Sequence, residues 1–401
     1  MRLHVWHGYL LGGTGSNTYA RQVAREWARA GHDVTVFSQE AHPEQFDLEG
    51  VTTVRPDVDG LLPVFVLDRY EGYEVRRMPD CPRDELERWV QANARALREH
   101  GPADLVLANH VVLGGPVGAA GDSPYVVKVH GSELEYAMRG HPGLARWGAE
   151  ALRGAAATVV GSQHIREVLH DVCGPLDRVH EIPPGVDVER WRPEPPGEAL
   201  ERLLEEARRD PPNPGNADAW LPDEDNAARL AAFLAGDRPT VVYVGKLIEN
   251  KGVGVLLEAL RGLDARAVVV GFGDARAGLQ RRAAGLDVLF TGALAQRHLV
   301  HLLALADVSV VPSIFPEAFG MVAAEAAATG CPPVVADHSG LAGVARELEE
   351  RYPRPPAAWR ASRPPTPPRC ATGWTACCRS APPTVTRCAP PPAAPRSSAG
   401  A

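Results

Sequence analysis

Short runs of β-branched and other apolar residues alternate with amphipathic segments along most of this chain. In the first half, the apolar runs predict strands at 3–7, 33–38, 104–109, 125–130, 158–162 and 179–183. In the second half, they predict strands at 240–245, 267–271, 288–292, 308–312 and 333–336. Helical periodicity marks stretches between them, for example 18–30, 85–99, 253–261 and 319–329. This alternation predicts an α/β fold of parallel sheets covered by helices, which bind ligands at the carboxyl ends of their strands.

A stretch rich in Pro, Asp and Glu separates the two series of strands. We predict a first Rossmann-like domain at 1–190, an acidic insertion or connection at 191–239, and a second, incomplete Rossmann-like domain at 240–351. Two surface helices are predicted within the connection, near 198–209 and 226–234, and its acidity is interpreted as a solvated face. Residues 352–401 form a tail rich in Pro, Arg and Cys, for which we predict disorder.

The composition of this tail suggests a shifted reading frame. In a GC-rich gene, Leu codons read one base late give Cys or Trp. The Cys and Trp residues of the tail have the spacing of one helical face: Cys370, Trp374, Cys377, Cys378 and Cys388. We hypothesise that the closing helices of the second domain are lost. This loss predicts weak stability or aggregation and reduced or absent activity, and resequencing the gene tests the hypothesis.

Charge and cysteine usage narrow the class of protein. Residues 351–401 contain eight Arg and no Lys, Asp or Glu, whereas the whole chain has a net charge of -8, so the preceding part is strongly acidic. An acidic body argues against nucleic-acid binding, which needs a basic face. Cys81, Cys173 and Cys331 show neither metal-ligand spacing nor a disulfide framework. No apolar run is long enough for a transmembrane segment and no secretory signal is evident, so we expect a cytoplasmic protein.

Two motifs in the first half lie where a strand gives way to a helix. Residues 12–17 read GGTGSN, and glycines beside the free N–H groups of a helix start suit a bound phosphate. Residues 129–133 read VHGSE and place His130 at the carboxyl end of a strand, where it can donate to a sugar hydroxyl or stabilise charge on a leaving group. Taken singly, the first motif also fits a plain turn, and His130 also fits a side chain satisfied within the fold.

Two motifs in the second half carry charged residues. Residues 244–252 read VGKLIENKG, and Lys246 and Lys251 lie at a helix start, which disfavours cations unless they face an anion such as a diphosphate. Residues 316–325 read PEAFGMVAAE, and the spacing of Glu317 and Glu325 predicts that both carboxylates lie on a similar side of a helix. A carboxylate accepts hydrogen bonds from vicinal hydroxyls, which suits a ribose or a hexose.

With these four motifs the chain resembles the retaining glycosyltransferases of family four, whose GT-B fold has two Rossmann-like domains that face each other across a cleft. The resemblance covers about residues 1–350 and includes GSQH at 161–164, IPPGVD at 182–187 and GFG at 271–273. It implies transfer of a hexosyl unit from a nucleotide-diphosphate sugar, with UDP favoured, retention of anomeric configuration and no metal or other cofactor. The acceptor is expected to be a small molecule, a glycan or a lipid.

The resemblance also implies roles for residues of the first half and for one glutamate. His130 and Glu317 are expected at the reaction centre, where both contact the donor sugar and His130 helps to stabilise the transition state. Gly13 is expected to approach the donor phosphate or the reaction centre. On the acceptor side we expect Asn109 and His110.

The remaining donor-binding residues come from the second half of the resemblance. Lys246 and Lys251 are expected to neutralise the diphosphate leaving group, although relatives often carry Arg at the first position. The backbone of Phe319 and Gly320 is expected beside the sugar, and Glu325 is expected to bind the nucleotide ribose. Metal ligands are not expected.

Other activities fit the same motifs. A nucleotide-sugar binder without turnover would result from loss of the closing helices, and a sugar-nucleotide epimerase shares the two-domain fold. The paired Glu and Lys residues fit the transferase better. A dinucleotide oxidoreductase fits least, because residues 38–40 offer only a faint match to the acidic residue that such enzymes need. Peripheral membrane association stays open if the acceptor is a lipid, although no basic amphipathic helix is evident.

Overall fold

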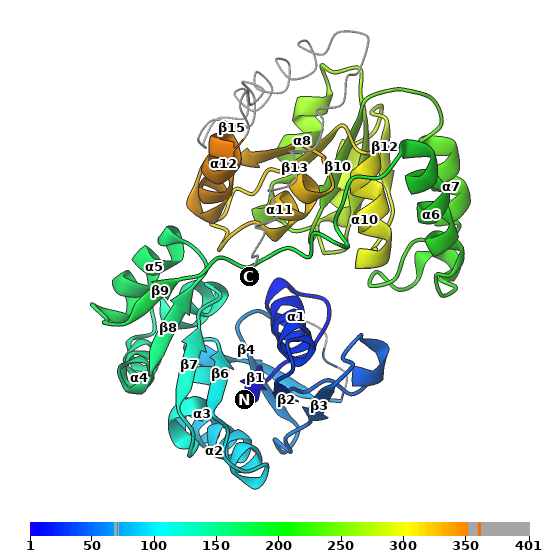
Figure 1. Ribbon diagram of the computed structural model, residues 1–401. Coiled ribbons are helices and arrows are strands. Elements are labelled where there is room, and N and C mark those ends of the chain that lie inside the picture. Colours follow the sequence, from blue (N-terminus) through cyan, green and yellow to red (C-terminus); the bar gives the residue numbers. More distant parts are fainter. Residues whose placement is uncertain (68–69, 71, 352–359, 362–401) are drawn as a thin grey trace, which may run out of the picture. The chain divides into compact units, whose positions relative to one another are not determined.

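Two α/β units make up the computed structural model, which describes residues 1–67, 70, 72–351 and 360–361. The first unit is Met1–Pro184 and the second is Gly185–Ala401 (Figure 1). The hypothesis of a frameshifted, disordered tail concerns residues 352–401, and all of these except 360–361 lie outside the described part.

A seven-stranded parallel sheet forms the centre of the first unit, with the strand order β3-β2-β1-β6-β7-β8-β9. Its strands are β1 (Arg2–Trp6), β2 (Asp33–Phe37), β3 (Val51–Val54), β6 (Leu105–Asn109), β7 (Tyr125–Lys128), β8 (Ala157–Val160) and β9 (Val179–Glu181). Its helices are α1 (Gly15–Arg29), α2 (Arg83–Glu99), α3 (Gly114–Ala120), α4 (Pro142–Gly154) and α5 (Gln163–Cys173). The order of the strands reverses between β1 and β6, and such a switch point is where ligands bind in doubly wound folds.

All six strands predicted for this unit are confirmed, but three others were missed. They are β3 and the pair β4 (Leu61–Val64) and β5 (Glu74–Arg77), which forms a separate two-stranded sheet. Each is four residues long, β4 contains Pro63, and β5 is mostly charged. Such short segments lack a helix or strand period of their own, so only their tertiary contacts define them.

The second unit contains a six-stranded parallel sheet with the order β12-β11-β10-β13-β14-β15, and its switch point lies between β10 and β13. Its strands are β10 (Thr240–Val244), β11 (Arg266–Val270), β12 (Val288–Phe290), β13 (Val308–Val311), β14 (Pro333–Ala336) and β15 (Arg360–Ala361). Its helices are α6 (Pro196–Arg208), α7 (Asn226–Phe233), α8 (Val253–Leu260), α9 (Arg276–Arg282), α10 (Gln296–Leu305), α11 (Met321–Ala328) and α12 (Ser339–Arg351).

Successive residues of the central strands of this unit enter two different cores. Val241 and Tyr243 of β10 belong to the cluster packed with α8, whereas Val242 belongs to the cluster that contains Trp191 and residues of α6, α7 and α10. Because side chains of a strand alternate between the two faces, a sheet covered on both sides needs apolar residues at every position. This requirement explains the continuous apolar runs that predicted the strands.

The acidic stretch 191–239 is part of the second unit. The two helices predicted in it are confirmed as α6 and α7, and Figure 1 shows α6 packed beside α10, with α7 beside α6. Leu203 and Leu230 are fully buried there. The interpretation of its acidity as a solvated face is wrong for three residues: Glu194, Asp210 and Asp223 are almost fully buried as side chains. Several of their basic partners, on α9 and α10, lie too far along the sequence to be matched from it.

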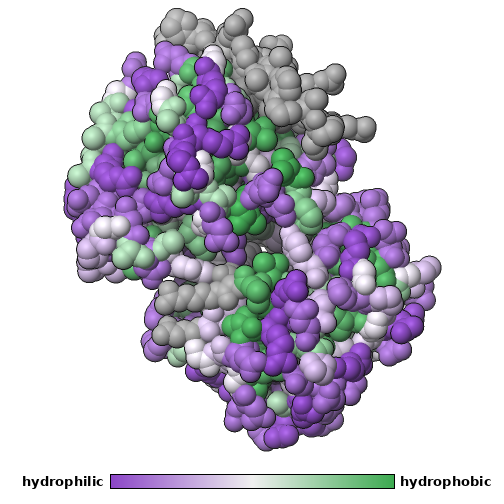
Figure 2. Space-filling view, turned by 180° about the vertical axis from the view of Figure 1, so that it is seen from behind, coloured by the Kyte–Doolittle hydropathy of each residue, from purple (hydrophilic) through white to green (hydrophobic). Residues whose placement is uncertain are grey.

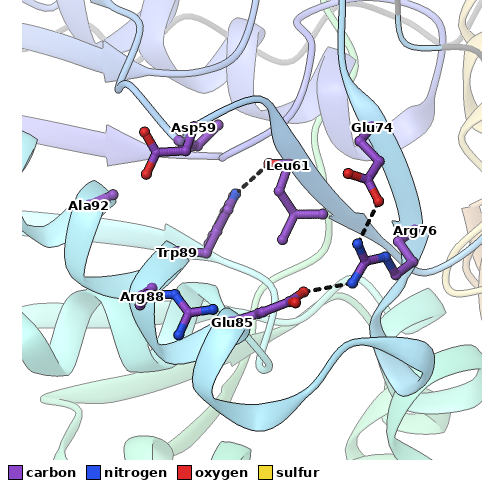
Figure 3. Close-up of a pocket in the computed structure, with 9 residues that line it drawn as sticks. Asp59, Leu61, Glu74, Arg76, Glu85, Arg88, Trp89 and Ala92 are labelled. Carbon is purple, nitrogen blue, oxygen red and sulfur yellow. Dashed lines mark hydrogen bonds and ion pairs between the residues drawn. The ribbon is translucent and has the colours of Figure 1, made fainter.

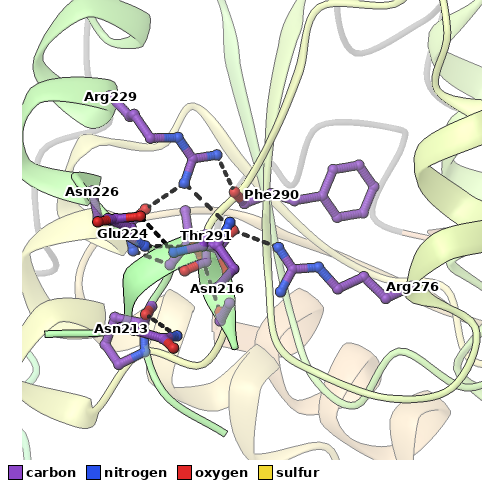
Figure 4. A network of polar contacts seen from close by, with 12 residues as sticks. Asn213, Asn216, Glu224, Asn226, Arg229, Arg276, Phe290 and Thr291 are labelled. Carbon is purple, nitrogen blue, oxygen red and sulfur yellow. Dashed lines mark hydrogen bonds and ion pairs between the residues drawn. The ribbon is translucent and has the colours of Figure 1, made fainter. Parts of the chain in front are cut away.

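Asp223 takes part in one such network, whose labelled members in Figure 4 include Arg229 and Arg276. Its carboxylate pairs with Arg276, and Arg229 lies 3.4 Å from the same oxygen while donating to the carbonyl oxygen of Phe290 at 2.7 Å. Asn226 donates to the carbonyl oxygen of Thr291 at 2.8 Å. These contacts attach the connection to the carboxyl end of β12.

A second network centres on Arg266, at the start of β11. Its guanidinium donates to the carbonyl oxygens of residues 233–236, at the end of α7 and just beyond, and to the hydroxyl of Thr240 at 2.8 Å. Helix ends leave carbonyls without intrahelical partners, and here one side chain satisfies several of them. Burial lowers the pKa of Arg266.

Candidate active site

The glycine loop between β1 and α1 is fixed by a histidine at the end of β1. Gly13 has a φ of 88°, a left-handed conformation that suits glycine. Asn17 donates to the carbonyl oxygen of Gly12 at 2.5 Å, and its Oδ1 lies 2.8 Å from Nε2 of His7. Because the Asn17 amide nitrogen is already used, its oxygen accepts from His7. The side chain of His7 therefore ties the loop to the sheet.

Three imidazoles, His7, His110 and His130, come after β1, β6 and β7 at the switch point of the first sheet, and we call them the imidazole cluster. The ring centroids of His7 and His110 are 5.7 Å apart, and those of His110 and His130 are 4.7 Å apart. Burial and the neighbouring imidazoles lower the pKa of His7 to about 3 and that of His130 well below its usual value. His7 and His130 are therefore neutral at pH 7.

Glu133 is fully buried beneath the cluster. One carboxylate oxygen lies 3.3 Å from Nδ1 of His110, and the other accepts from the backbone N–H of His130 at 2.9 Å. Burial alone would raise the pKa of Glu133, but the charge and hydrogen bond of His110 and the backbone donors lower it overall. An ionised Glu133 accepts the Nδ1 proton of His110, and Nε2 of His110 is buried without a partner within the described residues.

Asn109 determines the tautomer of His130. Its amide nitrogen donates to the carbonyl oxygen of Trp6 at 3.0 Å, so its oxygen, 2.8 Å from Nε2 of His130, accepts a proton from that imidazole. Neutral His130 then carries its proton on Nε2 and presents Nδ1 as an acceptor. The structure thus brings together His130, Asn109 and His110, which the sequence placed in two separate roles. His110 has the uncommon left-handed φ of 72°.

In the second unit, Lys251, Ser313 and Glu317 meet at the switch point, and we call them the lysine–glutamate cluster. The ammonium of Lys251 lies 2.5 Å from Oε1 of Glu317, and the Ser313 hydroxyl donates to the same oxygen at 2.7 Å. Lys251 precedes α8, whereas Ser313 and Glu317 come after β13. Lys246 lies in the loop after β10, with its ammonium 5.9 Å from the ring centroid of Phe272.

The loop that carries Glu317 is fixed against the start of α12. The backbone N–H of Glu317 donates to the Ser339 hydroxyl at 2.9 Å, and the carbonyl oxygen of Glu317 accepts from the backbone N–H of Gly340 at 2.9 Å. Gly320 begins α11 with a φ of 105°, and a Cβ there would lie 2.4 Å from a methyl group of Leu341. Both the conformation and the close packing therefore require glycine. Phe319 packs beside Leu341 in the same apolar cluster.

Glu325 has different surroundings from Glu317. It lies inside α11 and is 8% exposed, whereas Glu317 lies in the loop before that helix. Burial raises the pKa of Glu325 to about 7, although the charge of Arg190 opposes the change. The carboxyl group is therefore partly protonated near neutral pH.

Several residues that the structure places in these clusters were given no role from the sequence. They are His7, Asn17, Glu133, Ser313 and Ser339. His7 ends a predicted strand, Ser313 directly follows another, and Glu133 lies within a motif already recognised. Their positions after strands were the available signal, but the partners of Glu133 and Ser339 lie 23 and 22 residues away and required the tertiary fold.

Lysine is rare in this chain and gathers at these two sheet ends. The sequence contains three lysines, Lys128, Lys246 and Lys251. Lys128 is the last residue of β7, and the other two lie between β10 and α8. The remaining cationic residues of the chain, apart from histidines, are arginines. All three lysines therefore lie at the carboxyl ends of the two sheets.

A pocket elsewhere in the first unit is lined by β4, β5 and α2 (Figure 3). Three of its charged side chains pair with one another: Arg76 lies 2.5 Å from Glu74 and 2.6 Å from Glu85. Trp89 closes one wall and donates to the carbonyl oxygen of Leu61 at 3.1 Å. These satisfied pairs make it a poorer candidate than the sheet ends.

The described residues contain no group of three or more His, Cys, Asp or Glu side chains arranged to bind a metal ion. None of the helices in the described part has the length and apolar character needed to cross a bilayer.

Two doubly wound α/β units, each with polar residues at the switch point of its sheet, define a GT-B fold. Anabaena HepE, solved in complex with UDP-glucose, has a similar structure with a TM-score of 0.64 at 16% identity, over 94% of this chain and 89% of that one. A family model described as Glycosyltransferase Family 4 matches residues 13–190, and one described as Glycosyl transferases group 1 matches residues 226–361. The chain belongs to the family 4, group 1 glycosyltransferases, and it is an enzyme of the hexosyltransferase class.

Relatives of known name are similar over different parts of the chain. D-inositol 3-phosphate glycosyltransferase of Xylanimonas cellulosilytica is 29% identical over 354 residues, which cover 82% of this chain and 76% of the relative. GDP-mannose-dependent alpha-(1-6)-phosphatidylinositol dimannoside mannosyltransferase of Mycobacterium tuberculosis is 42% identical over 107 residues, 25% of this chain and 28% of the relative.

Proposed function

We propose that this enzyme transfers a hexosyl unit from a nucleotide-diphosphate sugar to a polyol acceptor, with retention of anomeric configuration and without a metal ion. The bond from the anomeric carbon to the diphosphate oxygen breaks, and the anomeric carbon bonds to an acceptor oxygen. The proton of the acceptor hydroxyl passes to the departing diphosphate. The lysine–glutamate cluster at the switch point of the second sheet carries this proposal.

The diphosphate is the leaving group that Lys246 and Lys251 are suited to stabilise. Charge that develops on it meets two ammonium groups already placed at the sheet end, and such preorganised charge lowers the barrier to transfer. Glu317 and Ser313 hold the Lys251 side chain in one position. When a diphosphate binds, Lys251 shares its ammonium between Glu317 and the phosphate, while Glu317 remains beside the sugar with the backbone of Phe319 and Gly320.

The nucleotide ribose is assigned to Glu325. Its carboxyl group accepts two vicinal hydroxyls best when ionised, so nucleotide affinity should rise as the pH passes through about 7, the pKa of Glu325. UDP is the proposed nucleotide, and GDP is the second choice because one of the relatives is named as GDP-mannose-dependent.

The first unit contributes to the transferred sugar and the acceptor. Nδ1 of His130 accepts a hydrogen bond from a sugar hydroxyl, and Asn109 keeps His130 in the required tautomer. Gly13 lets the backbone approach the reacting groups without a side chain. His110, held by Glu133, faces the acceptor through its Nε2, which has no partner among the described residues.

An inositol-type polyol is the proposed acceptor, because the named relatives act on inositol 3-phosphate and on a phosphatidylinositol dimannoside. A lipid-linked form fits an apolar run beside the imidazole cluster. The ring of Phe65 lies 4.7 Å from that of His110, and Val66 and Leu67 are 50% and 60% exposed. Most of the surface in view in Figure 2 is hydrophilic, with smaller hydrophobic areas on each unit. We propose a cytoplasmic location, and a lipid acceptor would place the enzyme at the membrane surface.

Calorimetry with UDP, GDP and ADP, in the presence of EDTA, tests the donor site. We expect micromolar binding of one nucleotide that is lost in Lys251→Ala and weakened in Glu325→Ala. Incubation of the matching nucleotide sugar with inositol and inositol 3-phosphate then tests transfer, and NMR of the product gives its anomeric configuration. Absence of nucleotide binding by a folded sample, or a strict need for a divalent metal, would contradict the proposal.

A further inference from the structure

Lys128 is a buried cation for which neither the fold nor the proposed transfer step gives a role. It ends β7, two residues before His130, and only 3% of its surface is exposed. Long cationic side chains normally reach solvent with their charged ends, and fully buried ones are paired. Lys128 is the only lysine in the first unit. Its burial therefore needs an explanation.

The ammonium of Lys128 is poorly satisfied by the protein. Among the described residues, its only hydrogen-bond acceptor is the carbonyl oxygen of Ile182, at the long distance of 3.4 Å. Its other close contact is the face of the Tyr19 ring, 5.0 Å from the ammonium. Glu133 contributes a favourable charge, but its two oxygens are already used by His110 and by the backbone of His130. Two N–H donors of the ammonium thus lack an acceptor in the described part of the chain.

The surroundings of Lys128 do not fit a purely structural role. An ammonium has three donors and no acceptor, and burying it with few partners costs free energy that an apolar side chain of the same length would not cost. Burial lowers the pKa of Lys128 to about 8, which is still high enough for most of it to be charged at pH 7. A group with this combination of charge, burial and missing partners is typical of binding sites.

Tyr19 connects Lys128 to the imidazole cluster. Its ring lies 5.3 Å from that of His130, edge to face, and it belongs to α1, directly after the glycine loop. Tyr19 is half-buried, and burial raises the pKa of its hydroxyl to about 12. Gly161 borders the ammonium just after β8, where even an added Cβ would remain 3.6 Å away. The Tyr19 ring therefore contacts both the ammonium of Lys128 and the imidazole of His130.

We propose that Lys128 and Tyr19 bind a phosphate group of the acceptor, beside the hydroxyl that receives the sugar. A phosphate supplies the acceptor oxygens that the ammonium lacks, and it can also accept from the Tyr19 hydroxyl. The donor diphosphate already has Lys246 and Lys251 in the second unit, so the lysine of the first unit is assigned to the other substrate. This inference rests on the proposed function, because it takes the first unit as the acceptor side.

Thermal unfolding of the full chain with saturating UDP tests the proposal. Inorganic phosphate, added at constant ionic strength, should raise the melting temperature of the UDP-bound wild type further. Because UDP already fills the donor site, this further increase reports phosphate binding at the Lys128 site. In Lys128→Met this second increase should be lost, while the increase caused by UDP alone stays. In Lys246→Met the increase caused by UDP should be lost, while the increase caused by phosphate stays. No increase by phosphate in the UDP-bound wild type, or an equal increase in Lys128→Met, would overturn the proposal.

The same experiment separates a binding role from a structural one. Without ligands, Lys128→Met should melt at the same temperature as the wild type or higher, since a buried charge with few partners is removed. A lower melting temperature with unchanged phosphate binding would make Lys128 a structural residue. If the wild type shows no response to UDP, GDP or ADP, the proposed function fails instead, and the two failures are thereby distinguished.

Because the chain has only three lysines, acetylation by an amine-reactive ester gives a test without substitutions. Mass spectrometry at pH 8 should show that UDP protects Lys246 and Lys251, whereas phosphate protects Lys128. D-inositol 3-phosphate and vesicles of phosphatidylinositol then compete as protecting agents, which identifies a soluble or a lipid source of the phosphate. Acetylation of Lys128 that phosphate does not slow, or no acetylation of Lys128 in the free protein, would overturn the proposal.

Discussion

The two sheet ends solve the problem of placing polar groups in opposite ways. At the end of the first sheet His7 and His110 are almost completely buried, and His7 and His130 are uncharged. At the end of the second sheet Lys251 and Glu317 form an ion pair, and their side chains are 34% and 20% exposed. The first sheet end therefore depends on buried, neutral imidazoles held in fixed positions. The second depends on charged side chains that a ligand can neutralise. Different substitutions should break each of them.

The largest effect is expected at the charged end. Lys251→Ala should lower kcat/KM by about 10²–10³-fold, the usual loss when one group that stabilises a leaving charge is removed. Steady-state kinetics with the nucleotide sugar measure this loss. Lys251→Arg, which keeps the charge beside Glu317, is the matched control and should recover part of the activity. A Lys251→Ala enzyme with activity near that of the wild type would remove the basis for the contrast between the two ends.

The pH dependence of stability should reveal the buried carboxyl of Glu325 in the second unit. Because the folded-state pKa of Glu325 is raised to about 7, the folded protein keeps a proton that the unfolded chain loses above its ordinary pKa of 4.5. The free energy of unfolding should therefore fall as the pH rises through this window, by roughly 3 kcal/mol in total. Urea unfolding at pH 5 and pH 8 should show a smaller fall in Glu325→Gln. Equal falls in both proteins would contradict the assignment.

Substitutions at the buried end of the first sheet should mainly lower the free energy of unfolding. Glu133→Gln removes the anionic partner of His110 and should lower the free energy of unfolding by about 2 kcal/mol, typical of buried hydrogen bonds to a charged group. Glu135→Gln is the control two residues away, since Glu135 forms a surface ion pair with Arg139 worth at most about 1 kcal/mol. Similar losses in the two variants, measured by urea unfolding, would show that burial of Glu133 is not decisive.

The smallest effect should come from the hydroxyl that helps to orient Glu317. Ser313→Ala removes one hydrogen bond to this carboxylate and should cost about 1 kcal/mol, a several-fold fall in kcat/KM. Ser309→Ala, on the strand that precedes it, is a sharp control because the Ser309 hydroxyl is buried with no partner in the described part. It should keep its activity and its stability. If Ser309→Ala lost as much activity as Ser313→Ala, the hydroxyl of Ser313 would have no special role.

The strands and the loops after them could be predicted from the sequence because they depend on local pattern. Apolar runs located β1, β6, β7, β10 and β13, and the glycine and lysine motifs located the loops at their carboxyl ends. Pairings between distant residues could not be predicted in this way. Glu133 meets His110 across 23 residues, and Lys251 meets Glu317 across 66. Separate roles were predicted for Lys251 and Glu317, and only the fold shows that one holds the other.

The acidic connection shows the same limit from the other side. Its composition indicated a solvated face, yet Asp223 pairs with Arg276 across 53 residues and is 4% exposed. Nothing near Asp223 in the sequence distinguishes it from the exposed acids around it. Local composition predicts solvation correctly only when no basic partner arrives through the fold.

The contacts of Arg266 bear on how this enzyme can be recombined with its relatives. In a chimera joined at residue 240, Arg266 would come from this enzyme and the segment corresponding to residues 233–236 from the relative. Arg266 would then lose the carbonyl oxygens that it binds in this chain. A junction near residue 185 keeps Arg266, α7 and the acidic connection together as one inherited block. Exchange of nucleotide-sugar preference between family members should therefore succeed with blocks cut at that earlier point and fail with blocks cut at the first strand of the second sheet.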